Sequence, residues 1–288
     1  MTEEPRAWLA RAGRAGERVD WALAEAVTPG GYGDVPDLSK CQSLQEVREV
    51  VAEALPNEKA QARANYAAQL WALRGRMSQG DYIVLPRKGT GQLAIGRIQG
   101  PYEYRSSELD PDRRHVRSVQ WISTDTLRSN IKQDLLYSLG AFSTYCEVSR
   151  NEAAKRIAAV ATTGRDPGTS PGLVIPGQVS GDEVSMDSSD SVVDLEQFAN
   201  DRIIARIQED FAGHRMQDLV AAVLSAQGFT CRTAPDGADG GIDILAGSGP
   251  LGMDEPRLVV QVKSEQSAVP DPDVTQLLGS ESKHQPAQ

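Results

Sequence analysis

The chain has 288 residues, of which 40% are hydrophobic and 24% are charged. This length suits one large domain or two modest ones, and the hydrophobic share is enough for a packed core. Because no apolar run of about 18 residues occurs, we expect no membrane-spanning helix. The charged N-terminus lacks the apolar segment of a secretion signal, so we expect a cytoplasmic protein.

The net charge of −10 is unevenly distributed. Residues 1–160 hold 22 Lys and Arg against 20 Asp and Glu, whereas residues 161–288 hold 8 against 20. Nucleic-acid-binding proteins usually carry a basic surface, which we therefore expect in the first part of the chain. The acidic second part disfavours strong sequence-independent DNA binding, but its carboxylates suit a divalent metal.

Residues 161–193 are rich in Gly, Ser, Pro and Asp and show little apolar periodicity. This composition predicts a flexible acidic linker, to which we assign residues 161–195. The linker separates an N-terminal domain, residues 1–160, from a C-terminal domain, residues 196–288.

The N-terminal domain begins with a short mixed segment, after which apolar spacing predicts a helix over residues 43–55. Ser43 is its expected cap, with Glu46 three residues further on. Further elements are a helix over 57–76, strands over 81–86, 93–98, 102–104 and 116–122, and helices over 135–139 and 151–160. This pattern predicts a small α+β domain around a curved sheet.

The C-terminal domain is predicted to begin with a helix over 195–211, which is interrupted at Gly213. A second helix, over 216–227, ends at Gly228, a residue type that suits the position after a helix. Strands are predicted over 229–233, 242–246 and 257–263, with a Gly-rich bend over 237–241 and another helix near Pro272. The pattern is that of a small α/β domain.

Polar residues interrupt the last two of these strands. Because strand side chains alternate between faces, Asp243 points opposite to its apolar neighbours, and Gln261 shares a face with Lys263. A carboxylate, an amide oxygen and the carbonyl of Val262 could hold Mg2+ or Mn2+. The lysine could stabilise charge on a reacting phosphate. Taken singly, however, such strand residues are more often solvated polar positions.

Gly240 and Gly241 would leave room for a phosphate backbone to approach. The segments GHRMQDLVAAVLSAQGF (213–229), PDGADGGIDIL (235–245) and LVVQVKS (258–264) together resemble the PD-(D/E)XK nuclease superfamily, in particular Mrr-type restriction endonucleases. The resemblance implies a restriction-endonuclease-like fold.

The same resemblance implies roles for individual residues. Asp243 and Gln261 would bind the metal, and Lys263 would be the catalytic lysine. Gln217 stands where relatives often have Glu, while Asp218 points about 100° away around the helix. Relatives continue with a helix and a covering strand, so we expect this nuclease domain to be C-terminally short.

The segment GDYIVLPRKGTGQLAIGRIQGPYEYRSSELDPDRRHVRSVQWI (80–122), with residues 8–23 and 31–39, resembles EVE/PUA-like modules found in some Mrr-type proteins. The resemblance implies a β-barrel-like domain that reads a modified base flipped into an aromatic pocket. The candidate base- and DNA-binding residues are Trp8, Arg14, Tyr102, Tyr104, Arg117 and Trp121. Trp121 is equally expected in the core.

These features favour a modification-dependent restriction endonuclease whose partner is DNA carrying a modified base and which does not bind membranes. A homodimer is a candidate assembly, because cutting both strands usually requires two active sites. One alternative is a modified-DNA-binding protein with a degenerate, inactive nuclease domain. Another is that residues 196–288 are a scaffold for another subunit.

Overall fold

The computed structural model describes residues 4–169, 195–211, 213, 215–234, 242–263, 274, 275 and 277. The chain divides into two compact units, unit 1 (Met1–Asp201) and unit 2 (Arg202–Gln288), and each has its own sheet. No helix in the described ranges is long and apolar enough to span a membrane.

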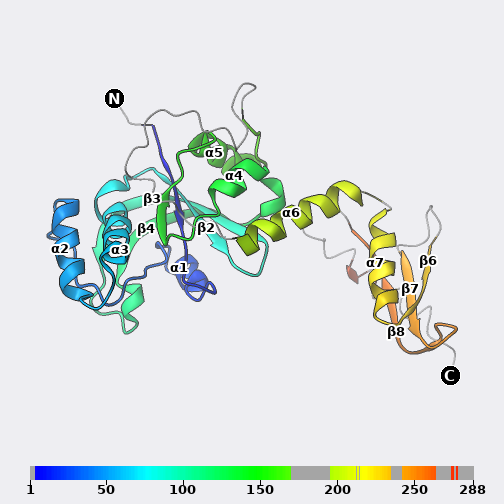
Figure 1. Cartoon of the computed structure of the whole chain (residues 1–288). Coiled ribbons are helices and arrows are strands. Elements are labelled where there is room, and N and C mark those ends of the chain that lie inside the picture. The colour runs from blue at the N-terminus through cyan, green and yellow to red at the C-terminus, as the bar shows by residue number, and fades with distance from the viewer. Residues whose placement is uncertain are drawn as a thin grey trace. The chain divides into compact units, whose positions relative to one another are not determined.

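Unit 1 contains both helices and strands (Figure 1). Its elements are β1 (Ala7–Ala10), α1 (Val19–Ala24), α2 (Leu44–Ala54), α3 (Ala60–Trp71), β2 (Tyr82–Arg87), β3 (Gln92–Tyr104), β4 (His115–Leu127), α4 (Gln133–Ser138), β5 (Tyr145–Glu147) and α5 (Ala153–Thr163). A π-helical turn, Ala72–Arg76, continues α3, and short 3-10 turns, Pro111–Arg113 and Arg128–Asn130, flank β4.

The five strands of unit 1 form one sheet in the order β4-β3-β2-β1-β5. Strand β1 runs parallel to β2, and the other neighbouring strands are antiparallel. All four residues of β1 are buried, with Trp8 and Ala10 on one face and Ala7 and Leu9 on the other. A strand buried on both faces requires a cover on each side.

Helices supply both covers. Val51 of α2 and Leu70 of α3 pack in the same core cluster as Trp8, whereas Leu135 of α4 and Ile157 of α5 pack with Leu9. The described strands therefore make an open sheet between helical layers, with β4 and β5 at its edges. This corrects the expectation of a β-barrel-like domain, because helices pack on both faces of the sheet and the described strands do not close into a ring.

Most predicted elements of unit 1 are present. Ser43 caps α2, its hydroxyl accepting the Glu46 N–H at 3.3 Å, and the Glu46 carboxylate accepts the Gln42 N–H at 2.6 Å. The predicted strand over 102–104 is the end of the long, bulged β3. Strands β1 and β5 were not predicted, because both are short and the buried β1 has no polar–apolar alternation.

The first residues of the expected linker pack onto unit 1. Helix α5 continues to Thr163, and the buried Asp166 accepts hydrogen bonds from Arg156 at 2.8 and 2.6 Å. Arg156 also pairs with Asp134 at 2.6 Å, so three charged groups fix this end of unit 1. Residues 170–194 of the expected linker lie outside the described residues.

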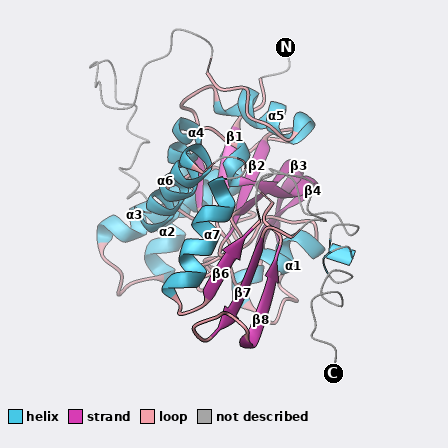
Figure 2. Ribbon diagram, turned by 90° about the vertical axis from the view of Figure 1, so that its right-hand side faces the viewer, coloured by secondary structure: helices cyan, strands magenta, loops and turns pink. Residues whose placement is uncertain are grey.

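Helix α6 (Leu195–Asp210) spans the boundary between the two units, and unit 2 continues with α7 (Arg215–Ala226), β6 (Thr230–Thr233), β7 (Ile244–Ser248) and β8 (Asp254–Val260). The three strands are antiparallel in the order β6-β7-β8, and α7 packs against β6 and β7 (Figure 2). Gly228, with φ of +94°, follows α7 as predicted. Of the helix expected near Pro272, only Val274, Thr275 and residue 277 are described.

Candidate functional site

Asp243 lies directly before β7, at one end of the three-stranded sheet of unit 2. The register places Thr233, the last residue of β6, and Val260, the last residue of β8, opposite Ile244. Two strands therefore end where β7 begins. Along β7, Ile244 and Ala246 are buried while Leu245 is exposed, which confirms the predicted alternation.

Backbone hydrogen bonds fix Asp243 in this position. Its N–H donates to the Val260 carbonyl at 2.9 Å, and its carbonyl accepts the Ala234 N–H at 2.8 Å. Its carboxylate also accepts the Val262 N–H at 2.5 Å. The side chain of Asp243 is therefore directed across the sheet toward the residues that follow β8.

Gln217 reaches the same region from the first turn of α7. Its side-chain amide donates to the Ala234 carbonyl at 3.3 Å. Ala234 thus joins Gln217 through its carbonyl and Asp243 through its N–H. Asp218, the neighbouring acidic residue, is exposed to solvent.

Gln261, Val262 and Lys263 follow β8 rather than lying within it. Gln261 and Val262 are half-buried, and Lys263 is exposed. We call the region formed by Gln217, Ala234, Asp243 and Gln261–Lys263 the Asp243 end of the sheet. Gly240 and Gly241, which we expected to admit a phosphate backbone, lie outside the described residues.

The residues of the Asp243 end fit a hard cation in part. In the described part of the chain, no group of three His, Cys, Asp or Glu side chains is arranged to hold a metal. The donors brought together are one carboxylate, on Asp243, next to a chain segment with the Gln261 amide and the Val262 carbonyl. Magnesium accepts such a set, because it commonly binds one or two carboxylates and completes its shell with water and substrate phosphate.

The predicted base-binding residues of unit 1 are in different surroundings. Trp8 has no exposed surface, and its indole N–H donates to the Asp81 carboxylate at 2.8 Å. Asp81 also accepts the backbone N–H groups of Arg6 and Ser78, each at 3.0 Å. Trp8 therefore belongs to the core in this structure, where it offers no face to a base.

Tyr102 also makes buried contacts. Its hydroxyl lies 2.8 Å from Nδ1 of His115, whose Nε2 lies 2.8 Å from the Val35 carbonyl. Because a carbonyl only accepts, Nε2 must donate, and Nδ1 then accepts from the Tyr102 hydroxyl. Burial lowers the pKa of His115, which keeps the ring neutral and this arrangement intact at neutral pH.

Arg117 lies under the π-helical turn that follows α3. Its guanidinium donates to the carbonyls of Leu73 at 2.5 Å, Gly100 at 3.1 Å and Arg74 at 3.1 Å. Burial lowers its pKa to about 10. Since its hydrogen bonds go to the backbone, Arg117 closes the carbonyl end of the turn in this structure instead of facing a phosphate.

The remaining three candidates keep solvent-accessible surface. Tyr104 packs edge-on against His115, with ring centroids 5.1 Å apart, and is half-buried. Trp121 is also half-buried, and its indole N–H donates to the Ala22 carbonyl at 3.1 Å. Arg14 is exposed. The structure does not gather the six candidates into one pocket, because Trp8 and Arg117 make their polar contacts inside the core.

Sequence reasoning missed Asp81 as the polar anchor beneath Trp8. Asp81 is the first residue of the strand predicted over 81–86, and an Asp at the end of a strand gives little signal, because such residues usually lie in turns.

Comparison with known families gives two matches. Residues 208–288 match the family of Mrr catalytic domains, described as restriction endonuclease, and residues 9–139 match a domain of unknown function, DUF8426. No curated protein matches the chain. The first match covers α7 and the sheet with Asp243, so it supports an Mrr-type nuclease domain in unit 2, with DNA as the implied substrate. The second match names no function, and the EVE/PUA-like module remains a prediction.

Proposed function

We propose that the chain is a restriction endonuclease that hydrolyses DNA at the Asp243 end of the sheet in unit 2. The observation that carries this proposal is the hydrogen-bonded link from Gln217 through Ala234 to Asp243 and on to Val262. Gln217, Asp243 and Val262, which the sequence order singled out, lie together with Ala234 within the region that matches the restriction endonuclease family.

In this proposal, Asp243, Gln261 and the Val262 carbonyl hold Mg2+ or Mn2+. Such a cation would lower the pKa of a bound water and offset phosphate charge. Lys263, directly after the proposed ligands, would donate to the phosphate oxygens as negative charge develops on them. The Val262 N–H keeps the Asp243 carboxylate turned toward this segment.

We further propose that unit 1 selects DNA that carries a modified base. Support comes from the sequence resemblance, from the less acidic composition of residues 1–160, and from the solvent-accessible Arg14, Tyr104 and Trp121. The buried Trp8 and Arg117 would then stabilise the domain instead of contacting the base.

A second candidate function is modified-DNA binding with an inactive nuclease domain. The observation in its favour is Gln217, whose amide contacts a backbone carbonyl where a carboxylate would add a metal ligand. With one carboxylate among the proposed ligands, metal affinity would be weak.

One assay separates these two functions. Plasmid DNA with and without methylated cytosine is incubated with the full chain and Mg2+ or Mn2+, while binding is measured in parallel without metal. We expect cleavage of the modified plasmid only. Binding without cleavage from a folded sample would establish the second function, and equal cleavage of both plasmids would overturn the proposed selection by unit 1.

A further inference from the structure

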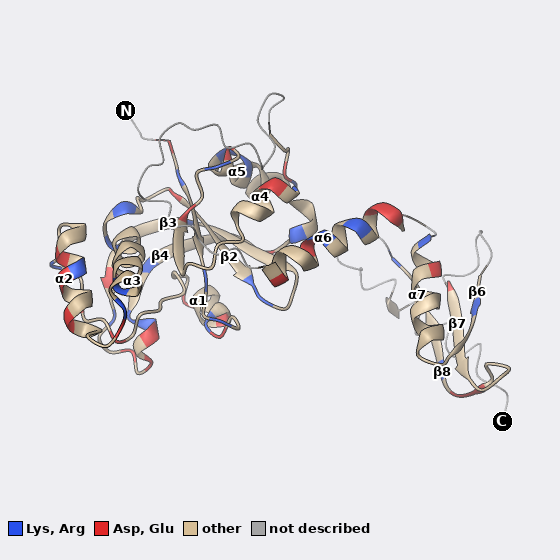
Figure 3. Ribbon diagram, viewed as in Figure 1, with Lys and Arg blue, Asp and Glu red and all other residues tan. Residues whose placement is uncertain are grey.

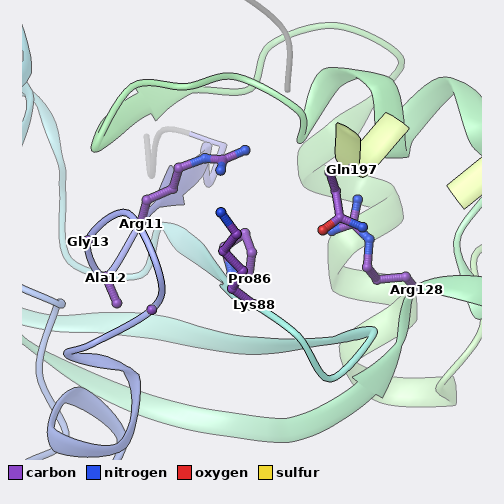
Figure 4. A pocket seen from close by; sticks show the side chains of 8 residues that line it. Arg11, Ala12, Gly13, Pro86, Lys88, Arg128 and Gln197 are labelled. Atoms are coloured by element: carbon purple, nitrogen blue, oxygen red, sulfur yellow. The ribbon is translucent and has the colours of Figure 1, made fainter. Parts of the chain in front are cut away.

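A small open pocket in unit 1 combines basic side chains with residues that leave space. It is lined by Arg11, Ala12, Gly13, Gly16, Pro86, Lys88, Arg128 and Gln197. Figure 4 shows Arg11 and Lys88 on one side, and Arg128 with Gln197 on the other. In the ribbon of unit 1, basic and acidic residues are otherwise interspersed (Figure 3). The pocket lining, by comparison, holds the three cations Arg11, Lys88 and Arg128.

Arg11 and Lys88 are positioned by contacts outside the pocket lining. The Arg11 N–H donates to the Thr144 carbonyl at 2.8 Å, and its guanidinium carbon lies 5.5 Å from the ring centroid of the exposed Phe142. Lys88, just after β2, donates from Nζ to the Arg14 carbonyl at 2.9 Å. One N–H of the Lys88 ammonium thus holds the loop that contains Arg14, and an ammonium group has three N–H donors.

The loop between β1 and α1 passes close to Lys88 because it contains glycines. A Cβ on Gly16 would lie 3.4 Å from the Lys88 Cβ, and Gly16 has a φ of +86° that other residues rarely adopt. Gly13 likewise has a φ of +97°. A Cβ on Gly13 would meet the Glu17 carboxylate, so Gly16 is the position whose missing side chain leaves room beside the lysine.

The start of α6 forms the other wall. Asp201 accepts two hydrogen bonds from the buried Arg128, at 2.8 and 2.6 Å, and a third from the Gln197 amide at 3.1 Å. Asp201 offsets the charge of Arg128, and Arg11 and Lys88 are the other two cations of the pocket lining. Gln197 adds a neutral polar group opposite these two cations.

We propose that this pocket binds a phosphate of the DNA backbone, a proposal that rests on the proposed action of the chain on DNA. Arg11 and Lys88 would donate to the phosphate oxygens, since charge-assisted hydrogen bonds to phosphate are stronger than neutral ones. The first turns of α6, held by the Arg128–Asp201 pair, complete the pocket. The site differs from the six base-reading candidates, of which only Arg14 adjoins it, through its carbonyl.

The test measures DNA binding by the full chain as a function of salt. A fluorescent duplex is titrated by anisotropy in EDTA with the wild type, Arg11→Ala, Lys88→Ala and the control Lys155→Ala on the exposed side of α5. We expect each pocket variant to weaken binding several-fold and to reduce the slope of log K against log salt by about 1. The control should keep the wild-type slope.

A fourth variant, Gln197→Glu, introduces a carboxylate opposite Arg11 and Lys88 and also replaces the amide that donates to Asp201. We expect it to weaken DNA binding about tenfold at low salt, and less at high salt, where charge repulsion is screened. Wild-type slopes in both alanine variants would overturn the proposal, as would unchanged binding by Gln197→Glu.

Two further outcomes separate this proposal from the proposed function. DNA cleavage by the wild type together with unchanged slopes in the pocket variants would overturn the pocket and leave the nuclease standing. Thermal stabilisation by inorganic phosphate that is lost in Lys88→Ala, with DNA binding unchanged, would show that the pocket takes free phosphate and would overturn the assignment to DNA.

Discussion

The residues that the sequence suggested as functional, or that carry charge, are buried to different extents in unit 1 and unit 2. In unit 1, Trp8, Arg117 and Arg156 are buried, and each is held by core hydrogen bonds. In unit 2, Gln217 and Asp243 are half-buried at the end of a short sheet. An abundance of aromatic and basic residues in a sequence therefore indicates a buried core as readily as a binding site. The order and spacing of polar residues on successive helices and strands indicate more strongly which side chains lie together in the folded domain.

The largest expected effect is on the stability of unit 1. Arg156→Ala leaves Asp134 and the buried Asp166 without their shared cation, so we expect a loss of about 3–5 kcal/mol in the free energy of unfolding. Urea or thermal unfolding of the full chain measures this. Lys155→Ala, on the same helix with an exposed side chain, should change stability by less than about 0.5 kcal/mol. Equal losses of stability in the two variants would contradict a stabilising role for the buried cluster of Arg156, Asp134 and Asp166.

The second effect concerns the rate of DNA cleavage by unit 2. We expect Lys263→Ala to slow DNA cleavage about 100-fold or more, since removing one donor to a charged transition state has effects of this size. DNA affinity should stay near the wild-type value. Arg206→Ala, in the exposed part of α6, is the matched control for loss of a cation. A parallel fall in affinity would make Lys263 a DNA-binding residue instead.

A smaller effect tests whether Trp8 is structural. Trp8→Phe removes the indole N–H that the buried Asp81 accepts, so we expect a loss of about 1–3 kcal/mol in stability. Binding of modified DNA by the folded variant should be unchanged. Full stability combined with lost selectivity for the modified base would place Trp8 in the recognition site after all.

The smallest effect is a pH dependence in unit 1. The hydrogen bonds from Arg156 lower the pKa of Asp134. Burial raises the pKa of Asp166, but hydrogen bonds from Arg156 and from two backbone N–H groups lower it by more. Both folded-state values lie below the unfolded value of about 3.9, so this stabilisation is present above about pH 4 and is lost as pH falls through the lowered values. Asp166→Asn should flatten the acid limb of a stability–pH curve, and an unaltered limb would contradict this assignment.

Much of the secondary structure could be predicted from the sequence, because α2 carries its own cap and α7 ends at a glycine. The arrangement of unit 1 could not, since β1 is short and buried on both faces, and its parallel pairing with β2 depends on residues about 75 positions apart. At the Asp243 end, the order of the segments indicated which residues would meet. The contact between Asp243 and the Val262 N–H depends on the ends of β7 and β8, which periodicity does not define.

The pocket at Arg11 and Lys88 could not be predicted from the sequence either. Its lining comes from four places along the chain, and α6, which contributes Gln197, is joined to Arg128 through Asp201. The spacing between these segments carries no signal of that pairing. Their meeting is a consequence of tertiary packing.

The assignment of DNA hydrolysis to the Asp243 end of the sheet is tested most directly by measuring DNA cleavage by Asp243→Asn, with Asp254→Asn as the control. The two substitutions make the same chemical change in one sheet, but Asp254 is at the far end of the β7–β8 pair. We expect Asp243→Asn to stop cleavage while DNA binding and folding persist, and Asp254→Asn to cleave as the wild type does. Cleavage by Asp243→Asn at the wild-type rate would contradict the assignment of the reaction to this end of the sheet.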